Sequence, residues 1–294
     1  MNVYKYNKEH LMYGHSTAIT DQKILNFLDS YKPNINEILS NGDPKIFCAQ
    51  YLKWIKSYTL NTLVGIEKYP YCCYSNGTTE SFDKFYLANS KRRFRCFKGE
   101  YLYHELSWRD RFAWSYIEDD QLDINDAVII SFPFADTGNE HISYKSLMAE
   151  CEEKNIPVLV DLAYYTISSG MTIDLNFDCI TDITFSLSKT FPVSHARIGI
   201  RLSKVDNDDS LFVYQKNRYT NRLGAHLGLT LINNFESDYI VNRYKDRQID
   251  ICKKLNVIPS NTVLFGIGNE QWQEYNRGTA TNRLSFHRIL HEQN

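Results

Sequence analysis

The middle of the chain combines short apolar runs with one amphipathic stretch. Residues 126–134 (D-A-V-I-I-S-F-P-F) and 156–160 (I-P-V-L-V) are continuous apolar runs, typical of strands that are buried on both faces of a sheet. Between them, residues 143–154 carry apolar side chains at helical spacing, with Leu147 and Cys151 on one face. Strand, helix and strand in this order predict a right-handed β-α-β unit with parallel strands.

Further short strands are expected on both sides of this unit. They cover residues 70–75, 178–186 and 196–202. The last should be antiparallel to its predecessor because the connection is tight. The first breaks at Gly77 and opens a helix over 79–88. Ligands bind where parallel strands end and helices begin, so we expect Gly77, Asp161 and residues 186–189 at one sheet edge.

The pattern changes after residue 202 to long, polar helical stretches. These cover residues 209–235 and 239–255, and strand and helix character follows in 262–267 and 282–289. We therefore predict an α/β protein with a three-layer, mostly parallel-sheet large domain and a small, reduced α+β domain. The predicted divisions are an N-terminal segment of the small domain (1–45), the large domain (46–235) and the C-terminal small domain (236–294).

Composition excludes several classes of protein. The chain has 294 residues with 43% hydrophobic and 23% charged residues, as in ordinary globular proteins. A formal charge of −2 argues against a nucleic-acid partner. Seven cysteines without a C-x-x-C pair argue against a disulfide framework or a metal site. No signal peptide or apolar run of spanning length is evident, which indicates a cytoplasmic protein that does not bind membranes.

The most informative stretch is residues 184–191, T-F-S-L-S-K-T-F. Lys189 follows a buried strand, where a lysine can lose its charge and attack an aldehyde. Ser186, Ser188 and Arg197, which lies eight residues after Lys189, are suited to hold a phosphate. With the A-R-I-G that follows, the stretch resembles the lysine motif of fold-type I enzymes of the aminotransferase class I/II (aspartate aminotransferase-like) superfamily. The alternative is a surface lysine beside a polar turn.

The resemblance implies a pyridoxal 5′-phosphate (PLP) cofactor held as an internal aldimine on Lys189, in a PLP-dependent transferase large domain. The segment D-L-A-Y, which begins 28 residues before that lysine, resembles a second motif of these enzymes. There Asp161 would pair with the pyridinium nitrogen and Tyr164 would hydrogen-bond the ring oxygen. An isolated aspartate at a strand end is more often a helix cap, but the spacing favours the cofactor role.

Two weaker signals complete the expected cofactor site. The segment S-N-G-T-T-E resembles the family's glycine turn, so Gly77, Thr78 and Thr79 would bind the phosphate through backbone amides. An ordinary helix cap would have the same sequence. Tyr101, 24 residues after Gly77, would stack on the cofactor ring, with Tyr103 as the neighbouring candidate and a packed core tyrosine as the alternative.

The C-terminal segment N-R-L-S-F resembles the strand whose arginine binds the substrate α-carboxylate. Arg283 is the expected residue, with Arg277 and Arg288 as competitors and a solvated surface arginine as the alternative. The sequence also departs from the family at the turn A-D-T-G, where Ala135 occupies the position of an asparagine that contacts the ring oxygen.

The predicted function is a PLP-dependent aminotransferase for an amino acid or a related amine. A lyase, racemase or decarboxylase on the same fold, and a non-catalytic descendant of it, are the alternatives. The resemblance also implies a homodimer with shared active sites. Thr220 or Arg222 would then act on the neighbouring subunit, unless residues 217–222 are simply an exposed polar helix.

Overall fold

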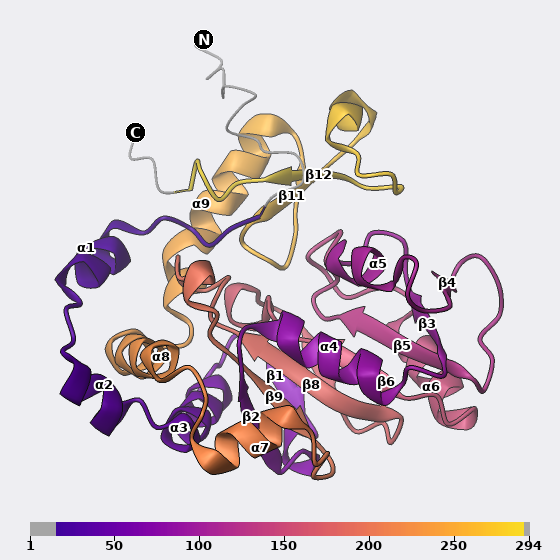
Figure 1. The fold of residues 1–294 in the computed structure, drawn as a ribbon. Helices are drawn as coiled ribbons and strands as arrows, with labels where there is room; N and C mark the ends of the chain where they lie inside the picture. Colours follow the sequence, from indigo (N-terminus) through magenta and orange to yellow (C-terminus); the bar gives the residue numbers. More distant parts are fainter. Residues whose placement is uncertain (1–15, 291–294) are drawn as a thin grey trace.

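A seven-stranded, mostly parallel sheet forms the centre of the molecule (Figure 1). The computed structural model describes residues 16–290, so the outermost parts of the predicted terminal segments lie outside the described residues. Across the sheet the strands are β2 (Tyr71–Ser75), β9 (Gly199–Ser203), β8 (Ile180–Ser186), β6 (Val158–Asp161), β5 (Asp126–Ser131), β3 (Arg93–Cys96) and β4 (Trp114–Tyr116). β9 is antiparallel to β8, as predicted, and also to β2, and the other pairs are parallel.

Helices cover this sheet and extend beyond it. Within residues 16–290 they are α1 (Gln22–Ser30), α2 (Ile35–Asn41), α3 (Pro44–Lys56), α4 (Thr78–Ala88), α5 (Tyr103–Trp108), α6 (Tyr144–Glu153), α7 (Ser210–Asn217), α8 (Arg222–Asn234) and α9 (Tyr239–Leu255). Their positions agree with the predicted helices over 79–88, 143–154 and 239–255 to within one residue at each end.

The central strands are buried on both faces because their side chains alternate between two apolar clusters. Val128 and Ile130 of β5 belong to the cluster that contains the apolar side chains of α6. Ala127 and Ile129 point the other way, into the cluster that contains the aromatic side chains of α4. All six residues of β5 are buried. The three-layer α/β/α prediction is therefore confirmed.

Three element predictions were wrong in detail. β5 ends at Ser131, before Pro133, which has no N–H for the strand ladder. The expected helix over 209–235 is two helices, since Arg218 adopts the left-handed conformation (φ 62°) and the Asn221 side chain caps α8. Residues 282–289 contain β12 (Asn282–Ser285) and, as far as residue 290, no helix.

Two smaller sheets flank the central one. β1 (Thr62–Val64) pairs in parallel with β7 (Thr172–Asp174), and neither strand was predicted. Near the C-terminus, β10 (Ile258–Pro259), β11 (Phe265–Gly268) and β12 form an antiparallel sheet that packs beside α9 (Figure 1). Among residues 16–290, no helix has both the length and the apolar character needed to cross a bilayer.

Candidate functional site

A cavity of about 250 Å³ opens at the carboxyl ends of the parallel strands. The strand register brings Ser75 of β2, Gly199 of β9 and Ser186 of β8 to one level, and pairs Asp161 of β6 with Thr184. Ten of the predicted site residues line this cavity, and the eleventh, Gly77, precedes Thr78. They are Thr78, Thr79, Tyr101, Asp161, Tyr164, Ser186, Ser188, Lys189, Arg197 and Arg283.

One wall of the cavity is suited to bind an anion. Gly77 precedes α4 with φ +75°, and a Cβ there would lie 2.4 Å from Arg197 Nη2, so only glycine fits. Arg197 Nη2 donates to Thr79 Oγ1 over 2.7 Å. No side chain caps the N-terminus of α4, so its first amides are available to a ligand. A helix N-terminus beside a guanidinium attracts a phosphate dianion.

Asp161 holds a carboxyl group inside the protein. Its Oδ1 accepts hydrogen bonds from Thr184 Oγ1 (3.0 Å) and the Ala163 amide (3.1 Å). No residue of the described chain donates to Oδ2. Burial raises the pKa of Asp161 to about 7, and the buried Glu100 contributes to this rise. A protonated ring nitrogen at Oδ2 would give this carboxylate the counter-charge that it lacks.

Lys189 and Tyr164 meet a segment from near the N-terminus. Lys189 Nζ donates to the carbonyl oxygen of Ser16 and lies 5.5 Å from the centre of the Tyr164 ring. Ser16 Oγ and the Tyr164 hydroxyl are 2.8 Å apart and share a hydrogen bond. Burial by itself would raise the pKa of Tyr164, but the charges of Lys189 and Arg283 and the Ser16 hydrogen bond bring it below its ordinary value.

The structure distinguishes between the two candidate stacking tyrosines. Tyr101 lines the cavity, and its amide donates to the buried carboxylate of Glu100 over 3.0 Å. Glu100 is held in turn by the amide and hydroxyl of Ser131. Tyr103 lies outside the cavity lining and donates its hydroxyl proton to Asp83. Only Tyr101 is therefore in position to contact a ligand in the cavity.

Among the three candidate arginines, Arg277 and Arg283 line the cavity and Arg288 does not. Arg283 is buried, donates to the carbonyl oxygen of Ala135, and lies with its guanidinium 4.3 Å above the Phe265 ring. Burial lowers the pKa of Arg283 to about 10, and the charge of Arg277 acts in the same direction. An anion in the cavity would stabilise both guanidiniums.

Sequence reasoning missed part of the lining. Ser16 and Thr17, and also Ser131 and Ser194, line the cavity. Ser16 is held by its hydrogen bonds with Tyr164 and Lys189, and the buried carboxylate of nearby Asp21 accepts from the Tyr244 hydroxyl of α9 over 2.6 Å. No local pattern marks Ser16, because its position depends on contacts with residues far away in the chain, whereas the position of Ser131 at the end of β5 could have identified it.

The cavity fits the parts of PLP. The glycine turn with Arg197 suits the phosphate, Asp161 suits the ring nitrogen, and Lys189 suits the aldehyde carbon. Ala135, however, offers no side-chain hydrogen bond to the ring oxygen, which leaves that role to the Tyr164 phenol, the residue expected for it from the sequence.

Solved structures resemble this one over most of the chain, although no protein-family model and no curated protein sequence matches it. An aminotransferase from Staphylococcus aureus is 12% identical, with a TM-score of 0.63 over 94% of this chain and 87% of that one. L-threonine-O-3-phosphate decarboxylase from Porphyromonas gingivalis is 14% identical, with a TM-score of 0.60 over 92% of each chain. A PLP-bound C-S lyase from Staphylococcus hominis is 12% identical, with a TM-score of 0.59 over 99% and 91%. This chain therefore has the fold of the fold-type I PLP-dependent enzymes.

Proposed function

We propose that this protein is a PLP-dependent enzyme that acts on an amino acid or a related amine, and that its reaction is transamination. One observation carries the proposal. Lys189, Asp161 and the anion-binding turn before α4 face a single cavity, and each matches one part of PLP. Aminotransferases and a PLP-bound C-S lyase share the fold, which supports the assignment.

Different residues of the cavity would bind different parts of the cofactor. Arg197 and the first amides of α4 would hold the phosphate, Asp161 Oδ2 would accept the ring N–H, and Lys189 Nζ would hold the aldehyde carbon covalently. When bound, PLP draws electrons from the substrate α-carbon and so stabilises the charge left when a bond there breaks. Tyr101 would contact the face of the ring.

The same residues also position the substrate and move its proton. Arg283 would hold the α-carboxylate, because its guanidinium is buried and its Nε has no hydrogen-bond partner among residues 16–290. Lys189 Nζ, when not bound to the cofactor, would take the α-proton of the substrate as a base and return it. Tyr164, with its lowered pKa, would accept a hydrogen bond near Nζ.

A lyase or decarboxylase is the second candidate. It would use the same residues and differ in which bond to the α-carbon breaks. The fold similarity to a threonine phosphate decarboxylase and a C-S lyase supports this second candidate. Ala135 in place of the family's asparagine supports it as well.

The test begins with purified protein and added PLP. We expect an absorbance band in the visible region that borohydride bleaches, with the reduced label mapping to Lys189. The Lys189→Ala variant should fold, lose the reducible label and lose about 100- to 10,000-fold in activity. With a panel of amino acids, a transaminase yields keto acids and pyridoxamine phosphate, whereas a lyase or decarboxylase releases a fragment of the substrate.

Lys245→Ala is the matched control, because Lys245 is also a lysine whose ammonium donates to a backbone carbonyl oxygen, that of Ser260, but it lies outside the cavity lining. This variant should keep the label. A protein that takes up no PLP would favour the non-catalytic descendant, and a label on another lysine would show that Lys189 is the wrong residue.

A further inference from the structure

The cavity holds more positive charge than the cofactor and an α-carboxylate require. Lys189, Arg197, Arg277 and Arg283 line it, against the single carboxyl group of Asp161. The proposed function gives a role to each of these except Arg277. A fourth cation in a partly closed cavity is unfavourable unless an anion binds there.

Arg277 lies in the turn between the short helix Glu270–Tyr275 and β12, and its side chain is 17% exposed. Within residues 16–290 its guanidinium pairs with Asp136 Oδ1, at the long distance of 4.0 Å. The described chain gives its guanidinium no hydrogen bond, although a guanidinium carries five N–H donors. Arg277 therefore faces the cavity with its donors uncommitted.

Asp136 and Thr279 fix the turn that carries Arg277. Thr279 Oγ1 donates to Asp136 Oδ2 over 2.7 Å, and Asp136 is only 2% exposed. Gly99 allows this close packing, since a Cβ there would lie 2.8 Å from the Asp136 side chain. The turn is thus anchored through Thr279, which leaves the Arg277 guanidinium available to a ligand.

Arg283 adds to the excess of positive charge around Arg277. It is buried beside the same cavity, and the neighbouring charge of Arg277 disfavours its ionised form. Both arginines line one cavity of about 250 Å³, and each is close enough to the other for their charges to interact, so a small ligand with two anionic groups can reach both. A bidentate arginine–anion pair is one of the strongest polar contacts in proteins.

We infer that Arg277 binds a second anionic group of the substrate, so that the substrate is an amino acid whose side chain ends in a carboxylate or a phosphate. This inference rests on the proposed function, which assigns the α-carboxylate to Arg283. Arg277 is then the residue that determines specificity, and Asp136 is its counter-ion when no substrate is bound.

The test measures the binding of three small anions to the full chain by calorimetry. Succinate carries two carboxylates, 3-phosphonopropionate carries a carboxylate and a phosphonate, and butyrate carries one carboxylate. We expect at least one of the two dianions to bind about 10- to 100-fold more tightly than butyrate, as for a hydrogen-bonded ion pair. The tighter of the two identifies the side-chain group as a carboxylate or a phosphate.

Arg277→Gln should reduce the affinity for the preferred dianion to about that of butyrate, and Arg277→Lys should keep part of the preference. Arg109→Gln is the control, because Arg109 is 55% exposed and pairs with Glu105 on the surface. It should change none of the three affinities. A wild-type protein without a preference, or an Arg277→Gln variant that keeps it, would overturn the inference.

None of these anions has an amino group, so none reacts with PLP. The measurement therefore gives its result whether or not Lys189 captures the cofactor. Failure of the labelling experiment would reject the proposed function alone, and loss of the dianion preference would reject this inference alone.

Discussion

Asp161 ends β6 with its carboxyl group inside the protein, where burial raises its pKa to about 7. In the unfolded chain the same group titrates near pH 4. Below about pH 4 Asp161 is protonated in both the folded and the unfolded chain, and its contribution to the free energy of unfolding is fully present. As the pH rises to about 7, the unfolded chain gains by ionising this group first, so that contribution is lost. Without a cation at Oδ2, the ionised Asp161 thus destabilises the folded protein at neutral pH.

We expect Asp161→Asn to stabilise the protein without PLP while it damages the proposed function. Asparagine keeps an oxygen that can accept from Thr184 and removes the buried charge. The gain in free energy of unfolding should grow between pH 5 and pH 8, to about 4 kcal/mol at most. Activity with PLP should fall by about two orders of magnitude or more, because the ring nitrogen loses its anionic partner.

Urea denaturation of the PLP-free protein at pH 5 and pH 8 provides the first measurement, and steady-state rates provide the second. Glu153→Gln, at an exposed carboxylate on α6, should change neither. If Asp161→Asn and Glu153→Gln lose activity to the same extent, Asp161 has no special role at the cavity.

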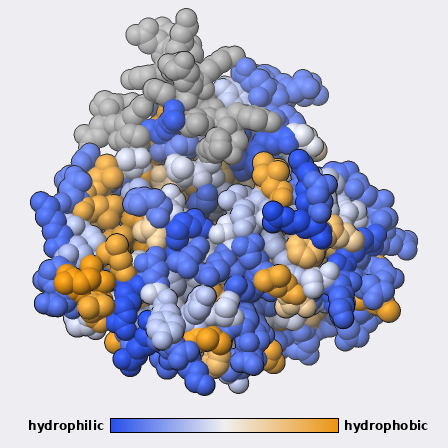
Figure 2. Space-filling model, in the orientation of Figure 1, coloured by the Kyte–Doolittle hydropathy of each residue, from blue (hydrophilic) through white to orange (hydrophobic). Residues whose placement is uncertain are grey.

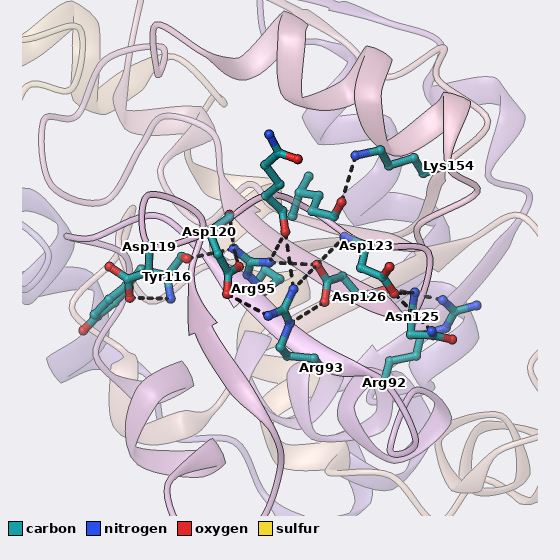
Figure 3. Close-up of polar contacts among 12 residues, drawn as sticks. Arg92, Arg93, Arg95, Tyr116, Asp119, Asp120, Asp123, Asn125, Asp126 and Lys154 are labelled. Carbon is teal, nitrogen blue, oxygen red and sulfur yellow. Dashed lines mark hydrogen bonds and ion pairs between the residues drawn. The ribbon is translucent and has the colours of Figure 1, made fainter.

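At the scale of elements, a buried ion-pair network joins β3 to β5. Figure 3 shows Arg93 and Arg95 of β3 pointing at Asp126, the first residue of β5. The distances are 2.7 Å from Arg93 Nε and 2.8 Å from Arg95 Nη1, and Arg95 and Asp126 are almost fully buried. Arg95 also pairs with Asp120 and so holds the loop that precedes β5.

The network should respond to acid in a defined direction. Burial tends to raise the pKa of Asp126, but hydrogen bonds from Arg93 and the Asp123 amide and the charge of Arg95 bring it below its ordinary value. A carboxylate with a lowered pKa contributes stability above the pH at which the unfolded chain titrates. That contribution is lost as the pH falls through the lower, folded-state pKa.

We expect Asp126→Asn to lower the free energy of unfolding at pH 7 by about 3–5 kcal/mol, since it removes the buried counter-charge of Arg93 and Arg95 and leaves them only the half-exposed Asp120. The difference from the wild type should shrink below pH 4. Denaturant titrations across this range measure both effects. Asp119→Asn breaks the exposed pair with Lys98 and serves as the control, which should change stability little. Equal effects of the two substitutions would contradict the prediction.

At the scale of the whole molecule, apolar side chains remain exposed on one face. Ile35 and Leu39 of α2, Ile46 of α3 and Leu223 of α8 are each at least half exposed. α2 and α3 both pack against α8, so these side chains lie on neighbouring helices. Figure 2 shows apolar residues over the part of the molecule where α2 and α3 lie. Such a patch is typical of a subunit interface.

We therefore expect a homodimer that buries this face. Wild-type protein should sediment as a dimer, and Ile35→Glu should shift it towards a monomer, because a buried interface disfavours an unpaired charge. Ile142→Glu is the control, since Ile142 is 98% exposed on another part of the chain. Sedimentation of the wild type as a monomer would contradict the prediction.

A shared site can be tested on the same dimer. Arg222 donates to the carbonyl oxygen of Leu39 in its own chain, whereas Thr220 Oγ1 is buried without a hydrogen-bond partner among residues 16–290. If residues 217–222 act on the neighbouring subunit, mixing inactive Lys189→Ala and Arg222→Ala proteins should restore part of the activity. Mixtures that stay inactive would show that each subunit works alone.

The sequence by itself determined the features that depend on neighbouring residues. Continuous apolar runs identified β5 and β6, and helical spacing identified α6 between them. The motifs around Asp161 and Lys189 could be identified from the sequence because each follows a predicted strand. Residues at the end of a strand lie at the edge of the sheet, whatever the position of that strand in it. Thus ten predicted residues line one cavity although sequence identity to the solved structures is only 12–14%.

Features that depend on contacts between distant segments of the chain were decided only by the tertiary structure. The pairing of β1 with β7 joins residues about 110 positions apart, and each strand is too short to show a period. Ser16 meets Tyr164 and Lys189 across 148 and 173 positions of the chain, and nearby Asp21 contacts Tyr244 of α9. Only the folded structure showed that Arg277 lines the cavity and that Arg288 does not. The physical reason is that such contacts arise from the complementary shapes and charges of folded surfaces, which no local pattern of residues encodes.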